Sequence, residues 1–177
     1  LRQPFTAEDM EHLRMECRRE RDLAIMEFLY STGVRVSEAV QLNRDQINFT
    51  EGECIVYGKG AKETEVYIKT KACIHQKNYL DSRTDNNPAL FVWTKKPYRR
   101  LSEKGIWAVL HNLGCRAEVE KTHPHRFRRT LATDALNRGM PLQEVQQMLG
   151  HEKADTTLIY CTVAKTSVKM SHKKYIA

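Results

Sequence analysis

Apolar residues recur every three to four positions along most of the chain, which predicts a mainly helical fold. Thr6 and Asp9 approximate a capping box for the first helix. Between residues 21 and 31 apolar side chains surround the expected helix, so we place it in the core and expect Gly33 to end it. Further helices are predicted at residues 37–42, 71–81, 102–118, 125–137 and 141–149, with a short last one at 157–160.

The spacing of apolar residues changes to alternation between residues 46 and 68. Glu53–Tyr57 and Glu63–Ile68 are β-rich runs joined by a short loop with two glycines, which predicts a hairpin. Gln46–Phe49 is expected to supply a third strand. The expected fold class is therefore α+β, mainly α with a small three-stranded antiparallel β-sheet. No repeat or linker divides residues 1–177, which we expect to form a single domain.

The composition of the 177 residues is that of a globular protein, with 41% hydrophobic and 29% charged residues. No apolar run approaches the ~20 residues needed to cross a bilayer, and the first residues do not resemble a secretory signal. The five cysteines form no C-x-x-C pair, a pattern typical of free thiols in a reducing compartment. We therefore expect a cytoplasmic protein.

Positive charge is concentrated in the second part of the chain. Residues 1–52 contain 7 basic and 10 acidic residues, whereas residues 53–177 contain 22 basic and 12 acidic residues. Such an excess favours a polyanionic partner, nucleic acid first and an anionic membrane surface second. A basic composition also aids solubility, so charge alone does not separate these interpretations.

Two candidate cations lie at turns. Arg35 follows the helix-ending Gly33 and precedes a new helix, where its guanidinium is placed either to meet an anion or to pair with Glu38. Lys59 lies between two glycines at the hairpin tip, where the backbone can approach a ligand closely. Most lysines in such turns simply face solvent, so neither residue is decisive by itself.

His125 and Arg128 form a further candidate pair. They are three residues apart at the start of a predicted helix, so they share one face near its positive end, which suits an oxyanion such as phosphate. His123 and His125 also make an H-x-H pair, but this is a poor zinc signature without further ligands at metal spacing. Leu149-Gly150-His151, with Tyr160 nine positions after the histidine, is the last cluster.

Each cluster is weak evidence alone, but their occurrence together in one order is specific to one protein family. The ordered set resembles the catalytic residues of the tyrosine recombinases, the family of phage and transposon integrases: Arg35, Lys59, His125, Arg128, His151 and Tyr160. T-G-V-R-V-S-E-A-V-Q-L, G-K-G-A-K-E-T, H-R-F-R-R-T-L-A-T and M-L-G-H-E-K-A-D-T-T-L-I-Y are similar to that family's motifs in order and spacing. The resemblance extends from Pro4 to about Thr162. One departure is Arg129, where many members carry histidine.

The resemblance implies a site-specific recombinase that cuts and rejoins DNA strands by transesterification, for the integration or excision of a mobile element. Tyr160 is then the nucleophile that forms a 3′-phosphotyrosyl intermediate, so no metal, ATP or other cofactor is needed. Arg35 and Arg128 are expected to hold the non-bridging oxygens of the phosphate. Lys59, in competition with Lys62, is expected to protonate the leaving 5′-oxygen.

The remaining implied roles are supporting ones. His125 is expected to accept or steer the proton of the phenol, and His151 to add a hydrogen bond to the phosphate. Glu38 is expected to orient the side chain of Arg35 or His125 without contacting the phosphate itself. The expected DNA-binding residues outside this set are Lys62, Arg126 and Arg129.

The same resemblance suggests partners and boundaries. We expect double-stranded DNA, a homo-tetramer on DNA but a monomer for an isolated fragment, and accessory DNA-bending proteins, with no membrane partner. Residues 1–162 would be the catalytic core, and residues 163–177 a tail that docks on a neighbouring protomer, folds back or is disordered. The helical DNA-clamping domain usual at the N-terminus of the family is missing, so we expect an excised catalytic domain.

Two other classes of function remain open from the sequence. A non-catalytic DNA-binding module would use the helices around Gly139-Met140-Pro141 as a helix-turn-helix. A metal-dependent nuclease would use His123, His125, His151 and nearby carboxylates. Covalent attachment to DNA in the presence of EDTA separates both from a recombinase.

Overall fold

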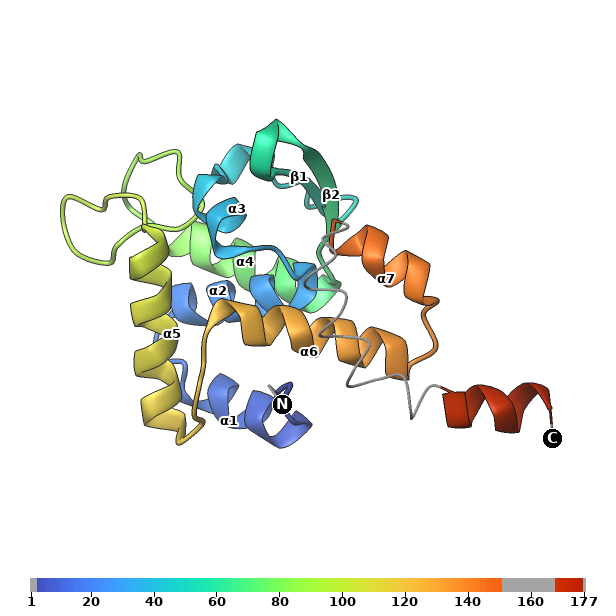
Figure 1. Ribbon diagram of the computed structural model, residues 1–177. Helices are drawn as coiled ribbons and strands as arrows, with labels where there is room; N and C mark the ends of the chain where they lie inside the picture. The colour runs from blue at the N-terminus through green and yellow to red at the C-terminus, as the bar shows by residue number, and fades with distance from the viewer. Residues whose placement is uncertain (1–2, 151–167, 177) are drawn as a thin grey trace.

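The computed structural model describes residues 3–150 and 168–176, and these are mainly helical (Figure 1). In chain order the elements are α1 (Ala7–Glu16), α2 (Glu20–Thr32), α3 (Val36–Gln41), η1 (Arg44–Gln46), β1 (Glu53–Tyr57), η2 (Lys59–Ala61), β2 (Glu63–Tyr67), α4 (Thr70–Ser82), α5 (Glu103–Ala117), α6 (Pro124–Asn137) and α7 (Leu142–Met148). Residues 168–175 form a further helix. Among the described helices, none has the length and apolar character needed to cross a membrane.

The core is built around α2, as the sequence predicted. This helix packs against α4 on one side and α6 on the other, and it also contacts α5 (Figure 1). Ile25, Phe28 and Leu29 are almost completely buried because apolar side chains surround the helix. Gly33 ends α2 with a left-handed backbone at φ 66°, which confirms the expected stop.

The N-terminal segment is held onto this core by its cap and by α6. Thr6 Oγ1 accepts the backbone N–H of Asp9 at 3.0 Å, and Asp9 Oδ2 accepts the N–H of Thr6 at 3.0 Å, so the predicted capping box is confirmed. Phe5 is buried, its N–H donates to Thr130 Oγ1 at 2.8 Å, and its ring lies 4.8 Å from the ring of Phe127.

The described part of the sheet contains two strands, so the expected third strand is wrong. β1 and β2 pair antiparallel, with Glu53 opposite Tyr67 and Tyr57 opposite Glu63. Within the expected strand Gln46–Phe49, Gln46 ends η1 and Asn48 makes only a single bridge to Glu53. The Asn48 side chain accepts the N–H groups of Thr50 at 3.1 Å and Glu51 at 3.0 Å, and this local turn replaces a strand ladder.

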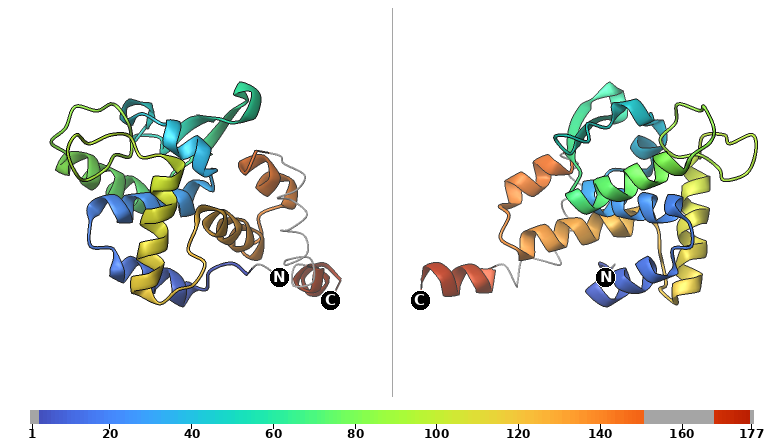
Figure 2. Two further views of the ribbon diagram at one scale, coloured as in Figure 1. Left: turned by 60° about the vertical axis from the view of Figure 1, so that its left-hand side comes forward. Right: turned by 180° about the vertical axis from the view of Figure 1, so that it is seen from behind.

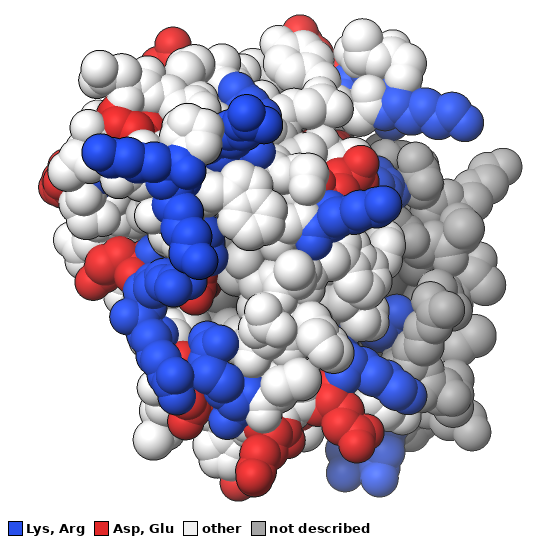
Figure 3. Space-filling view, turned by 90° about the vertical axis from the view of Figure 1, so that its left-hand side faces the viewer, with Lys and Arg blue, Asp and Glu red and all other residues white. Residues whose placement is uncertain are grey.

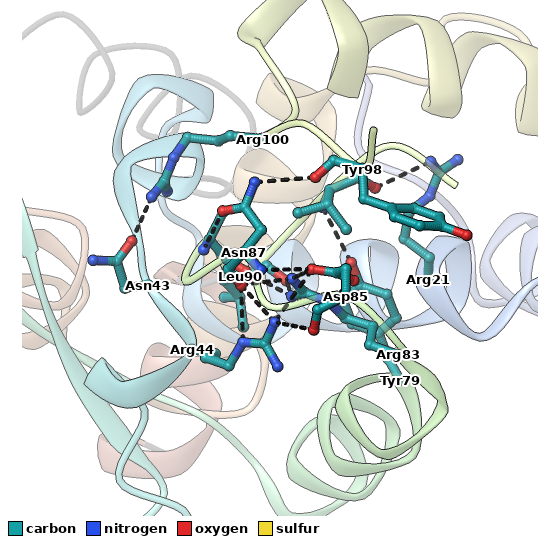
Figure 4. Close-up of polar contacts among 12 residues, drawn as sticks. Arg21, Asn43, Arg44, Tyr79, Arg83, Asp85, Asn87, Leu90, Tyr98 and Arg100 are labelled. Atoms are coloured by element: carbon teal, nitrogen blue, oxygen red, sulfur yellow. Dashed lines mark hydrogen bonds and ion pairs between the residues drawn. The ribbon is translucent and has the colours of Figure 1, made fainter. Parts of the chain in front are cut away.

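The long connection between α4 and α5, residues 83–102, is held in shape by arginines that donate to backbone carbonyls (Figure 4). Arg83 is engaged by both oxygens of Asp85 and donates to Ala89 O at 2.6 Å. Arg44 donates to Asn87 O, and Arg100 donates to carbonyls at the end of α3. Several donors in one planar group allow each arginine to tie separate turns of the loop together.

Candidate active site

Arg35 stands at the junction between α2 and α3. The chain leaves α2 at Gly33, and Arg35 is the residue that caps α3. Its backbone N–H donates to Glu38 Oε1 at 2.8 Å, and Glu38 is only 5% exposed. The buried carboxylate therefore fixes the backbone from which the Arg35 side chain projects, which supports the positioning role expected for Glu38.

Arg128 connects two of the motifs directly. Its guanidinium, on α6, donates from Nη1 to Gly33 O at 2.6 Å and from Nη2 to Leu149 O at 2.5 Å. Arg128 is 6% exposed, so these hydrogen bonds are largely shielded from water. Gly33 lies two residues before Arg35, and Leu149 lies two residues before His151. The Arg128 side chain thus attaches to α6 both the segment that leads to Arg35 and the segment that leads to His151.

The close approach at this junction requires glycine at position 33. A methyl group there would lie 2.8 Å from Leu149 Cδ2 and 2.9 Å from Leu131 Cδ2. The positive φ of Gly33 adds a second reason, because other residues are strained in that conformation. Leu149 also belongs to a small apolar cluster with Ala132, Leu136 and Val145 that attaches α7 to α6.

The hairpin brings the candidate lysines to the same region. Lys59 is exposed within η2, between β1 and β2. Just before it, a methyl group on Gly58 would lie 3.3 Å from Glu38 Oε2, so the hairpin loop rests against the carboxylate that caps α3. On the other side of the loop, Lys62 Nζ donates to Gly150 O at 3.5 Å. Figure 2 shows the hairpin, α3, α6 and α7 arranged around one region of the molecule.

His125 projects from the first turn of α6 as part of an aromatic group. Its ring lies 6.3 Å from that of Trp107 on α5 and 6.2 Å from that of His123, both with edge-to-face geometry. Trp107 also stacks on His123 with centroids 5.0 Å apart. His125 itself is exposed, and it lies one helical turn before Arg128, as its spacing predicted. Trp107 therefore supports the exposed imidazole from the neighbouring helix.

Arg126 and Arg129 are largely engaged within the protein. Arg126 Nε donates to Gln3 O at 3.0 Å, Nη1 donates to Glu120 O at 2.5 Å, and the guanidinium carbon lies 4.2 Å from the centre of the Phe5 ring. These contacts give Arg126 a structural role at the N-terminal segment. Arg129 is 8% exposed. Direct contact of either residue with DNA stays a prediction.

Two members of the expected set, His151 and Tyr160, lie outside the described residues, as does the helix predicted at 157–160. Within the described ranges no three His, Cys, Asp or Glu side chains are grouped closely enough to hold a metal ion. What the described residues establish is a meeting point: the turn before Arg35, the hairpin loop with Lys59, the first turns of α6, and the residues immediately before His151.

The comparisons with known proteins agree with this geometry. The model of the phage integrase family matches residues 4–167. Tyrosine recombinase XerA of Pyrococcus furiosus is 39% identical over 151 residues, covering 84% of this chain and 52% of the relative. Tyrosine recombinase XerC of Oceanobacillus iheyensis is 37% identical over 162 residues, covering 88% of this chain and 53% of the relative.

Solved structures show the same fold. A crystal structure of XerA recombinase superposes with a TM-score of 0.83 at 26% identity, over 99% of this chain and 64% of the other. XerH recombinase, in a post-cleavage complex with its difH substrate, superposes with a TM-score of 0.75 at 21% identity, over 98% of this chain and 53% of the other.

The fold and the matched sequence are of the tyrosine recombinase type. The chain belongs to the phage integrase family. It spans about half the length of the curated relatives that it matches.

Some contacts that build the site were not foreseen from the sequence. Trp107 was assigned only to a helix, and no motif of the sequence included it. The acceptors of Arg128 are backbone carbonyls of Gly33 and Leu149, which carry no side-chain signal. Gly33 was predicted only to end a helix, so the close approach there was not foreseen.

Proposed function

We propose that this chain is the catalytic part of a site-specific DNA recombinase, which cuts and rejoins strands through a 3′-phosphotyrosyl intermediate during integration or excision of a mobile element. The observation that carries the proposal is the pair of hydrogen bonds from the Arg128 guanidinium. One bond goes to the segment before Arg35 and the other to the segment before His151. A phosphate placed beside this junction would meet cations from three separate motifs.

The proposed reaction balances without an external reactant. The phenolic oxygen of Tyr160 attacks the scissile phosphorus, a new P–O bond to the tyrosine forms, and the bond to the 5′-oxygen breaks. The proton of the phenol passes to His125 or to solvent, and Lys59 gives a proton to the leaving 5′-oxygen. The reverse attack by a 5′-hydroxyl reseals a strand, so the ester conserves the bond energy.

The cations stabilise the charge that develops on the phosphate. In the proposed site Arg35 and Arg128 share the non-bridging oxygens, and His151 adds a further donor. Removing one preorganised donor of this kind typically costs about 3 kcal/mol of transition-state stabilisation. Because Arg128 also donates to two carbonyls, its side chain is fixed before the substrate arrives.

The proposed partners are double-stranded DNA and further copies of this chain in the cytoplasm, with accessory DNA-bending proteins. The Tn1549 transposon integrase, a structural neighbour with a TM-score of 0.77 at 16% identity, was solved in complex with a circular intermediate DNA, which supports DNA as the partner class here. The described tail residues 168–176 support assembly through the tail, because Met170, Tyr175 and Ile176 are 54%, 72% and 69% exposed. We propose that residues 163–177 exchange between protomers of a tetramer and that the isolated chain is a monomer.

Covalent trapping tests this proposal. A nicked duplex, from which the 5′-hydroxyl fragment diffuses away after cleavage, should leave the chain attached to DNA in denaturing gels with EDTA present. Tyr160→Phe should bind the same DNA and give no adduct. Cleavage abolished by EDTA would indicate a metal-dependent nuclease, and binding without any adduct from the wild-type chain would indicate a non-catalytic module.

The assignment of the general acid has its own test. Lys59→Ala should lose far more cleavage than Lys62→Ala, because Lys62 already donates to Gly150 O in the folded chain. A substrate with sulfur in place of the bridging 5′-oxygen should restore cleavage by Lys59→Ala, since a thiolate leaves without protonation. Equal losses in the two variants, or no rescue by sulfur, would contradict the role of Lys59.

A further inference from the structure

We propose that residues 91–101 form a second DNA-backbone contact, a rigid basic hairpin that grips phosphates beside the candidate active site. This hairpin, here called the basic hairpin, lies in the connection between α4 and α5. The inference rests on the proposed function for its substrate, double-stranded DNA, but its residues belong to none of the recombinase motifs described above.

The basic hairpin is closed by backbone hydrogen bonds. Leu101 N–H donates to Phe91 O at 2.9 Å, Val92 and Arg100 form a bridge, and Trp93 N–H donates to Arg99 O at 2.8 Å. At the tip, Tyr98 N–H donates to Lys95 O at 2.9 Å. The chain therefore does not need to order this segment on binding, which removes an entropic cost from the association.

Its base is anchored in the core and in the loop before it. Phe91, Val92 and Leu101 are 2%, 3% and 1% exposed. The Asn87 side-chain amide donates to Tyr98 O at 3.0 Å, as Figure 4 shows. With its apolar base buried in this way, the basic hairpin can present only the side chains of its tip and outer side.

Those presented side chains are cationic. The sequence from Trp93 to Arg100 is W-T-K-K-P-Y-R-R, with no acidic residue, and Lys95, Lys96 and Arg99 are exposed. The neighbouring carboxylate, Asp85, is engaged by Arg83 and so does not neutralise them. Figure 3 looks onto the side of the molecule that carries this connection, where several Lys and Arg side chains project from the surface.

Arg100 attaches the basic hairpin to the candidate active site. Its Nη1 donates to Val40 O at 2.9 Å and to Leu42 O at 2.8 Å, which satisfies carbonyls at the C-terminal end of α3. Arg35 caps the opposite end of α3. Six residues of helix span about 9 Å. The base of the basic hairpin therefore lies about the length of α3 from the Arg35 cap.

The ligand that fits is the backbone of duplex DNA. Exposed lysines act as mobile point charges for phosphate and carry no base preference, so they add affinity and orientation without adding sequence specificity. We expect Lys95 and Lys96 to neutralise phosphates flanking the cleavage site.

The salt dependence of binding tests the basic hairpin. The chain with Lys95→Gln and Lys96→Gln should bind random duplex DNA more weakly, and its slope of log K against log salt should be shallower by about one unit for each lysine. The control is Lys77→Glu on α4, which lowers the net charge by the same two units on the far side of α2 from α6. A slope unchanged in the double variant, or changed equally in the control, overturns the proposal.

A second measurement uses the two tryptophans of the chain. In a Trp107→Phe background the emission comes from Trp93, which is 42% exposed at the side of the basic hairpin. Adding duplex DNA should change this emission, and the change should require Lys95 and Lys96. If saturating DNA leaves the Trp93 emission unchanged, the proposed contact between the basic hairpin and DNA is contradicted.

Covalent trapping separates the two proposals. Adduct formation by the wild-type chain tests the proposed function, whereas the salt slope of the Lys95→Gln, Lys96→Gln variant tests the basic hairpin. If the wild-type chain forms no adduct, the proposed function fails. If the adduct forms but the salt slope is unaffected, only the basic hairpin fails.

Discussion

Arg128 shows how one side chain serves both packing and chemistry. The sequence placed it beside His125 on a helix face suited to phosphate, and α6 confirms that spacing. The sequence did not predict that its guanidinium would also hold Gly33 O and Leu149 O. Every residue has a backbone carbonyl, so the pattern of side chains cannot predict which carbonyls accept these hydrogen bonds.

The junction around Gly33 gives a stability prediction. Gly33→Ala introduces both backbone strain and contacts of 2.8 and 2.9 Å with leucine side chains, so we expect a loss of about 2–4 kcal/mol in the free energy of unfolding. Gly60→Ala is the matched control: its φ is 73°, but no atom lies within 4 Å of the added methyl group. It should cost about 1 kcal/mol. Urea denaturation measures both, and equal losses would show that crowding at Gly33 is unimportant.

Trp107 is expected to act as a positioning residue for His125. Trp107→Ala should slow single-turnover cleavage about tenfold at saturating DNA, because the imidazole loses the ring that supports it. Trp107→Phe should retain most of the rate, since a smaller aromatic ring preserves part of the contact. If Trp107→Ala changes only DNA affinity or melting temperature, the positioning role is wrong.

At the scale of elements, the periodicity of apolar residues predicted the helices well because most of them bury one face or all faces. α1 begins after the predicted capping box, α2 ends at the predicted glycine, and α6 begins at Pro124, one residue before the predicted start. The third strand failed because Asn48 satisfies nearby backbone N–H groups itself. No element was predicted for the basic hairpin, because its arginine contacts join residues far apart in sequence.

The connection between α4 and α5 should depend on the charge of Asp85. Arg83 lowers the pKa of Asp85 from 3.8 to about 2, chiefly through their hydrogen bonds. The ionised carboxylate therefore stabilises the fold above about pH 4, and this stabilisation is lost as the pH falls from 4 to 2. Asp85→Asn should cost about 1–3 kcal/mol at pH 7, by breaking charge-assisted hydrogen bonds.

The same variant tested in acid checks the cause. Melting temperatures of Asp85→Asn and the wild-type chain should differ most near neutral pH and converge as the pH falls toward 2. A difference that stays constant over this range would mean that the amide disturbs the loop for a reason other than charge.

At the scale of the whole molecule, the family was predictable because several weak motifs had to occur together in one order. Each candidate alone had an ordinary structural explanation, and Arg126 illustrates this, since its contacts hold the N-terminal segment. The family match and the convergence of the hairpin, α3 and α6 support the combined interpretation. Contacts between distant segments, such as Arg100 with α3, had no counterpart in the motifs.

The central claim is that Tyr160 attacks DNA within a cluster of cations from separate motifs. Mass spectrometry of proteolysed, nuclease-treated adduct, formed with nicked duplex in EDTA, tests it most directly. We expect the nucleotide remnant on the peptide that contains Tyr160, joined through a 3′-phosphate. A remnant on Tyr57, Tyr67, Tyr98 or another residue, or no adduct from the folded chain, would contradict the account.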